Sequence, residues 1–160
     1  SYGGHMFAAG LTLKIENVRA FSERFEEIVS KTVPDGQQIQ TIEVDTKLAL
    51  HEITPRFYRI LRQFAPLGPH NLAPVFVTED VIDAGTSRLV GKNLEHIKLD
   101  LMEPDACSGI FPGIAFNLAG KLPVIQSGTP FDICYSIELN EFRGKTNLQL
   151  NIRDLKTKTC

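Results

Sequence analysis

The 160-residue chain is poor in cysteine and has no long apolar run. Its three cysteines, Cys107, Cys134 and Cys160, lie far apart and form no C-x-x-C pair, which argues against a disulfide framework or a zinc site. No stretch approaches the roughly 20 apolar residues of a membrane-spanning helix, and no charged-then-apolar leader opens the chain. We therefore expect free thiols in a reducing cytoplasm and no membrane partner.

The chain also lacks a strong net charge and any familiar catalytic signature. Its formal net charge is −2 at pH 7, so as a whole it is not a basic polymer-binding protein. It contains no Walker loop, no G-x-S-x-G turn and no paired-carboxylate signature. His51, His70 and His96 show no metal-ligand spacing with cysteine or carboxylate residues. The sequence thus predicts no catalytic residue and no metal ligand in this chain.

The charge that is present divides unevenly along the chain. Acidic residues predominate between Glu103 and Phe142, whereas basic residues predominate from Arg143 onward, with Asp154 as the single acidic residue there. Such an asymmetry indicates a basic edge on a protein that is otherwise close to neutral.

The first 36 residues predict a strand followed by a helix. Residues 15–33 repeat apolar side chains at the spacing of one helix face, with charged residues between them. The Pro-Asp-Gly run at 34–36 is expected to end this helix. We place a first domain segment over residues 1–36.

Residues 37–73 are predicted to link two domains. A short strand is expected at 41–44, and Thr54 with Pro55 predicts a helix start, because a hydroxyl caps the first turn and proline fits its first position. Three arginines lie off the apolar face of that helix and are expected to be solvated or to contact another domain: Arg56, Arg59 and Arg62.

From Pro74 the apolar period changes from helical to two, which predicts strands. Gly85 is expected to bend the first strand, and a helical turn at 118–123 separates the third from the fourth. The five expected strands cover residues 74–90, 94–102, 110–117, 131–139 and 147–155. This order is that of an OB-fold, so the predicted fold is mainly β with α (α+β), with a five-stranded OB-fold barrel over residues 74–158. A sandwich of the same strands is the alternative.

Two loops of this barrel carry candidate binding residues. In an OB-fold the loop between strands one and two and the loop between strands four and five flank the groove that holds oligonucleotides. These loops span residues 90–96 and 140–146 here. The candidate nucleic-acid-binding residues are Arg88, Lys92, Lys98, Phe142, Arg143 and Lys145. Phe142 is placed to stack on a base. The alternatives are that the basic side chains are simply solvated and that Phe142 packs on the end of the barrel.

Residues 3–5 read Gly-Gly-His. Paired glycines let a backbone approach a ligand closely and aim amides at an anion, and histidine can donate to a phosphate. A remnant of tag removal, a plain glycine turn and a structural histidine are three competing interpretations, and local chemistry leaves them open.

Four segments in order resemble one family. The opening YGGHMFAAGLTL resembles the G-G-H-x-x-A-A-G motif of the DHH-associated domain of DHH phosphoesterases. FAPLGPHNLAPVF, at residues 64–76, resembles the connector of the RecJ branch of that superfamily. RLVGKNLEHIKL and NEFRGKTNLQLNIRDLK resemble the strands of its OB domain. The chain is identified as a member of the RecJ family of single-stranded-DNA-specific exonucleases, as a C-terminal fragment.

The resemblance implies a role that this fragment shares with a missing domain. The full-length protein would be a 5′-to-3′ exonuclease of DNA repair and recombination, whose DHH domain holds two Mn²⁺ or Mg²⁺ ions. The fragment would bind no cofactor and would be inactive alone. By motif position, Gly3, Gly4 and His5 would meet the substrate's phosphates. The implied partners are single-stranded DNA, the DHH domain of the same chain and repair proteins.

Two other functions stay open at this point. The chain could be a stand-alone OB-type module that binds single strands or a partner protein. It could also belong to a DHH phosphatase acting on small nucleotides, which would share the G-G-H motif, although the connector and the OB-like tail speak against it.

Overall fold

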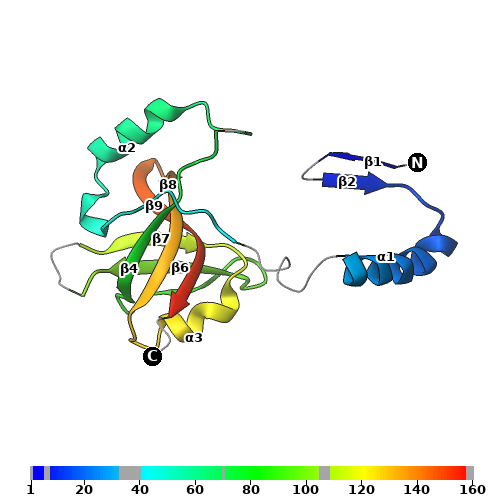
Figure 1. Cartoon of the computed structure of the whole chain (residues 1–160). Coiled ribbons are helices and arrows are strands. Elements are labelled where there is room, and N and C mark those ends of the chain that lie inside the picture. Colours follow the sequence, from blue (N-terminus) through cyan, green and yellow to red (C-terminus); the bar gives the residue numbers. More distant parts are fainter. Residues whose placement is uncertain (1, 6–7, 33–40, 70, 105–108, 158–160) are drawn as a thin grey trace. The chain divides into compact units, whose positions relative to one another are not determined.

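The structure is a computed structural model that describes residues 2–5, 8–32, 41–69, 71–104 and 109–157. It divides into two compact units, Ser1–Ile42 and Glu43–Cys160 (Figure 1).

Unit 1 is a hairpin followed by a helix. Strand β1 (Tyr2–His5) pairs antiparallel with β2 (Ala8–Leu11). A 3-10 turn, η1 (Ile15–Asn17), leads into helix α1 (Val18–Thr32), which confirms the predicted helix. The polar side of α1 is linked by ion pairs such as Arg19–Glu23, 2.9 Å, and Lys31–Glu27, 2.7 Å. No described residue of α1 is buried.

Unit 2 is a closed barrel. Its strands are β3 (Thr46–Lys47), β4 (Phe76–Asp83), β5 (Arg88–Val90), β6 (His96–Met102), β7 (Phe111–Ala115), β8 (Phe131–Phe142) and β9 (Lys145–Thr157). They are hydrogen-bonded in the order β3-β4-β8-β9-β7-β6-β5. A further pairing of β4 with β6 closes the ring, and β7 runs parallel to β9. The closure excludes an open sandwich and confirms the predicted OB-type barrel.

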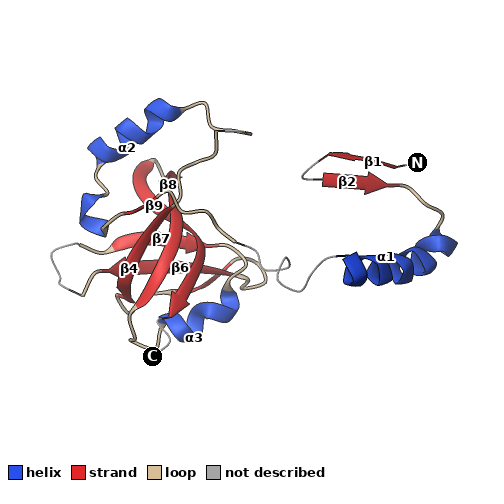
Figure 2. Ribbon diagram, in the orientation of Figure 1, coloured by secondary structure: helices blue, strands red, loops and turns tan. Residues whose placement is uncertain are grey.

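The helical elements lie where the predicted barrel requires them (Figure 2). The 3-10 turn η5 (Ala119–Lys121) and helix α3 (Leu122–Ile125) separate β7 from β8, as expected. The first predicted strand is β4 followed by β5. Gly85 lies between them with φ 87°, a conformation that favours glycine, so the predicted bend is confirmed.

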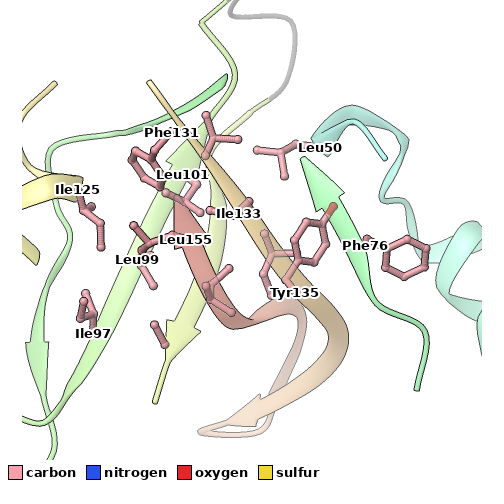
Figure 3. Close-up of a cluster of buried hydrophobic side chains, with 14 of the residues drawn as sticks. Leu50, Phe76, Ile97, Leu99, Leu101, Ile125, Phe131, Ile133, Tyr135 and Leu155 are labelled. Carbon is pink, nitrogen blue, oxygen red and sulfur yellow. The ribbon is translucent and has the colours of Figure 1, made fainter. Parts of the chain in front are cut away.

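Alternating side chains of the strands fill the barrel (Figure 3). Ile97, Leu99 and Leu101 of β6 face inward with no exposed surface, as do Phe131, Ile133 and Tyr135 of β8. The Tyr135 hydroxyl lies 2.8 Å from Thr78 Oγ1, which in turn donates to the Leu48 carbonyl at 2.5 Å. Burial raises the pKa of Tyr135 to about 12, because the charged phenolate is disfavoured there.

Part of the segment predicted as a linker belongs to this barrel unit. Strand β3 pairs parallel with β4, two residues beyond the expected strand at 41–44. Leu48, Leu50 and Ile53 are buried in the core, and the compact unit begins at Glu43. These apolar residues follow neither a helical nor a two-residue period, which is why the sequence pattern does not indicate their burial.

The predicted helix after that segment is confirmed as α2 (Pro55–Leu61), followed by the 3-10 turn η4 (Arg62–Phe64). The Thr54 hydroxyl accepts the Phe57 amide at 3.1 Å, as an N-cap does. Phe57 and Leu61 pack against the barrel core, which fixes α2 on the outside of the barrel.

Candidate nucleic-acid interface

The first group of predicted binding residues lies on neighbouring strands. Arg88 of β5 stands directly opposite Lys98 of β6, on the outer face of the barrel. Lys92 is exposed in the β5–β6 loop, where the Asn93 amide donates to the Glu95 carboxylate at 2.8 Å. None of these three cations forms an ion pair with any residue that the structure describes. Like charges directly opposite on a sheet are destabilising, so a bound anion would reduce the repulsion between Arg88 and Lys98.

An aromatic residue missed by the sequence analysis lies beside this group. Phe116 follows β7 and is 49% exposed, and its ring packs edge-on against His96 with centroids 5.0 Å apart. The Asn117 amide donates to His96 Nδ1 at 3.1 Å, which puts the proton of the neutral imidazole on Nε2. The period of two through Ile114 and Phe116 is the signal that could have identified this outward aromatic.

The second group of predicted residues lies at the tip of the β8–β9 hairpin. The turn consists of Arg143 and Gly144, with φ values of 51° and 73°, as a two-residue hairpin turn requires. Phe142 stands opposite Lys145 and is 64% exposed. The Arg143 guanidinium carbon lies 5.2 Å from the centre of the Phe142 ring, a cation–π contact. The tip is therefore a compact cationic and aromatic point, with Phe142 open to solvent.

The structure brings each group together but keeps the two groups apart. Lys98 is level with Ile114 of β7, and Ile114 is level with Asn151 of β9. Lys145 begins the same strand six residues earlier, about 20 Å away at roughly 3.3 Å per residue. The outer face of β6, β7 and β9 thus forms a path between them. Asp100 and Glu138 flank this path, engaged by Thr86 Oγ1 and Asn151 Nδ2 respectively.

The predicted phosphate-binding residues of unit 1 lie in β1. Gly3 is level with Gly10, and a side chain added at Gly3 would meet no atom within 4 Å. A Cβ at Gly4 would instead lie 2.9 Å from Ala9 Cβ, so Gly4 is required by the hairpin itself. His5 pairs through its backbone with Ala8, and its side chain lies outside the described part of the chain.

The described residues offer no metal centre. No group of three His, Cys, Asp or Glu side chains among them could hold a metal ion. Cys134 is free and partly buried, and desolvation raises the pKa of its thiol. Within the same residues, no helix is long and apolar enough to span a membrane.

The ring order, the parallel β7–β9 pair and the helix before β8 together define an OB-fold domain. Residues 44–154 match the family model of the RecJ OB domain, and the chain belongs to that family.

Two curated relatives of the chain have the same name. It is 32% identical over 154 residues to the single-stranded-DNA-specific exonuclease RecJ of Dickeya dadantii, covering 96% of this chain and 26% of the relative. The protein of that name from Bacillus subtilis is 30% identical over 158 residues, which cover 96% of this chain and 19% of the relative. The chain thus spans about a quarter or less of the length of these curated relatives.

A solved structure shares the fold. RecJ from Thermus thermophilus in complex with Mn²⁺ superimposes with a TM-score of 0.66 and 20% identity, over 100% of this chain and 22% of that chain.

Proposed function

We propose that this chain is the C-terminal region of a 5′-to-3′ single-stranded-DNA exonuclease of repair and recombination. In this proposal the barrel binds and positions the strand, and a DHH domain outside this sequence cleaves it with Mn²⁺ or Mg²⁺. Membership of the RecJ OB domain family supports the proposal. The observation that carries it is the pair of cations, Arg88 and Lys98, held opposite each other on the outer barrel face.

The proposed contacts divide by chemistry. Phosphates would neutralise the cations of both groups, and these contacts position a strand without reading its sequence. Exposed rings at the two ends of the path, Phe116 and Phe142, would stack on bases, which tolerates any sequence. Asp100 and Glu138 limit the positive potential of the path, so we expect binding by the isolated chain to be weak and strongly dependent on salt.

In the same proposal, unit 1 would contact the phosphates of the strand. The open space over Gly3 would let a phosphate approach the backbone closely, and Gly4 keeps the hairpin in shape. His5 would donate to that phosphate. These three residues are proposed to complete their site only when the DHH domain is present.

A titration of labelled single-stranded oligonucleotide at two salt concentrations tests the proposal. Affinity should fall steeply with salt, with a slope of about −0.7 per phosphate contacted. The double variant Arg143→Ala, Lys145→Ala should bind more weakly without losing its fold, because both residues lie at an exposed hairpin tip. Absent or salt-insensitive binding would overturn the proposal and favour a protein-contact role.

A nuclease assay on the pure chain with added Mn²⁺ tests whether cleavage requires a domain outside this sequence. We expect no cleavage of single-stranded DNA. Robust cleavage by this chain would contradict the proposal that a separate domain supplies the catalytic residues.

A further inference from the structure

A groove of about 710 Å³ runs between helix α2 and the β8–β9 hairpin, with the start of β7 as its third wall. Figure 1 shows α2 above that hairpin. Helix α2 contributes Tyr58 and Arg59, and the turn η4 that follows it contributes Arg62. The hairpin contributes Leu139 and Leu148, which stand opposite each other on β8 and β9. From the sequence, these arginines are expected to be solvated or to contact another domain.

The walls of this groove combine apolar area with positive charge. Leu139 is 43% exposed, and Tyr58 and Leu148 are half-buried, so apolar and aromatic surface remains open to a ligand. Arg59 of α2 and Arg62 of η4 are three residues apart in sequence, and both are exposed. Neither forms an ion pair within the described part of the chain. The groove therefore suits a ligand that has flat or apolar groups together with negative charge.

The groove continues directly from the hairpin tip. Thr146 lines it and follows Lys145 in β9, so the cationic tip stands at the mouth of the groove. A strand that leaves the tip at Arg143 and Lys145 would pass Glu141, which stands opposite Thr146, before it reaches Arg59 and Arg62. The aromatic ring of Phe142, exposed at that mouth, is a surface on which a base can stack.

We propose that this groove binds nucleotides of the single strand beyond the hairpin tip. Bases lie on Tyr58 and Leu139, and Arg59 and Arg62 contact phosphates. This inference rests on the proposed single-strand binding and extends it, because it carries the strand off the barrel face and along α2. The exposed ring of Phe142 and the groove-lining ring of Tyr58, on which bases can stack, favour a nucleic acid over an acidic peptide as the occupant.

The extension predicts a dependence on strand length. OB-folds bind about 4–16 nucleotides, and the barrel face alone accounts for the lower part of that range. A longer strand reaches the groove and gains its contacts, whereas a short strand binds on the barrel face only. Loss of the groove should therefore weaken the binding of long strands selectively.

The test measures the affinity of the 160-residue chain for fluorescent oligothymidylates of about 5 and about 16 nucleotides, at several salt concentrations. For Arg59→Ala with Arg62→Ala, we expect roughly a tenfold loss for the long strand and near-wild-type affinity for the short one. The slope of log affinity against log salt should become shallower by about 1.4 for the long strand, since each lost phosphate contact removes about 0.7.

Two controls separate the groove from the general charge and from folding. Arg56→Ala with Lys156→Ala removes the same charge from exposed positions that do not line the groove, and should leave the length dependence intact. Leu139→Asn should weaken the binding of the long strand, while Leu72→Asn, at an exposed leucine outside the groove, should not. Thermal melts establish that each variant is folded.

Three results would overturn the inference. Wild-type affinity of the Arg59, Arg62 variant for the long strand would assign the groove to another occupant, such as an acidic peptide. An equal loss of affinity for both strand lengths would show that the arginines act only through the overall electrostatic potential of the protein. Absence of any binding by the wild-type chain would instead remove the proposed function on which the inference rests.

Discussion

The two units of this chain differ in how far their apolar side chains are buried. In the barrel, alternate residues of β6 and β8 face inward and expose nothing, as Leu99 and Ile133 do. In α1, the residues that repeat at helical spacing stay open: Phe21 is 42%, Phe25 56% and Ile28 50% exposed. The rings of Phe21 and Phe25 stack on each other at 5.7 Å but do not form a core.

The difference shows which part of the chain holds its fold by itself. A closed barrel pairs nearly all its strand edges and buries a continuous core. A single amphipathic helix gains most of its stability from packing of its apolar face, and α1 has only 15 residues. The curated relatives that the chain matches are about four times its length, and we propose that residues outside this sequence cover that face.

The largest effect is expected from breaking the barrel. Leu150→Asp places an unpaired carboxylate at a fully buried position of β9, which should cost more than about 4 kcal/mol and unfold unit 2. Circular dichroism and a thermal melt measure this loss. Leu139→Asp, at an exposed position of β8, is the matched control and should leave the barrel folded. A cooperative melt at the wild-type temperature for Leu150→Asp would contradict the proposed core.

The next largest effect depends on which protein carries the change. Phe21→Ser with Phe25→Ser should alter the unfolding free energy of unit 2 in this chain by less than about 0.5 kcal/mol. In a longer protein that includes the upstream domains, the same change should lower the unfolding free energy of the domain that contains α1 by about 3 kcal/mol or more, because buried rings are then removed. Denaturant unfolding of both proteins measures the difference. Glu26→Ser, at an exposed position of α1, should be neutral in each. Equal small effects in both proteins would show that the apolar face of α1 is never covered.

A smaller effect is expected from high pH, and only in the barrel. The pKa of Tyr135 lies at about 12, above its usual value of 10, so the folded state holds the phenol proton more tightly. The protonated Tyr135 therefore contributes fully to the stability of the barrel below about pH 10. Between about pH 10 and pH 12 the unfolding free energy should fall by about 2 kcal/mol.

The variant Tyr135→Phe isolates this contribution. It removes the contact with Thr78, which should cost about 1 kcal/mol near neutral pH. It should also flatten the decline in unfolding free energy above pH 10, as followed by urea unfolding at a series of pH values. An unchanged decline would assign the pH dependence to other groups.

The parts predicted correctly were those with a local signal. The strict alternation over Phe131 to Leu139 predicts β8, because one face of that strand is buried in the barrel. Thr54 and Pro55 predict the start of α2, since capping depends on residues within one turn. Strand order then identified the OB-type barrel, as five such strands with a helix before the fourth have few other arrangements.

The parts that were missed depend on contacts distant in sequence. Leu50 is buried because α2 and β4 bring its segment back to the barrel, which no local period records. The groove joins Arg59 of α2 with Leu139 of β8, residues 80 positions apart. Phe116 lies in the predicted strand at 110–117, whose sequence does not indicate what its ring contacts. Only the register shows that its ring lies beside the β5–β6 cations.

The central claim is that the outer face of the barrel holds single-stranded DNA through Arg88 and Lys98. The most direct measurement is the affinity of Arg88→Ala with Lys98→Ala for a labelled single strand, set against the charge-matched variant Arg56→Ala with Lys156→Ala. For the Arg88 and Lys98 pair only, we predict roughly a tenfold loss of affinity and a slope of log affinity against log salt shallower by about 1.4. Equal affinities of the two variants would contradict it.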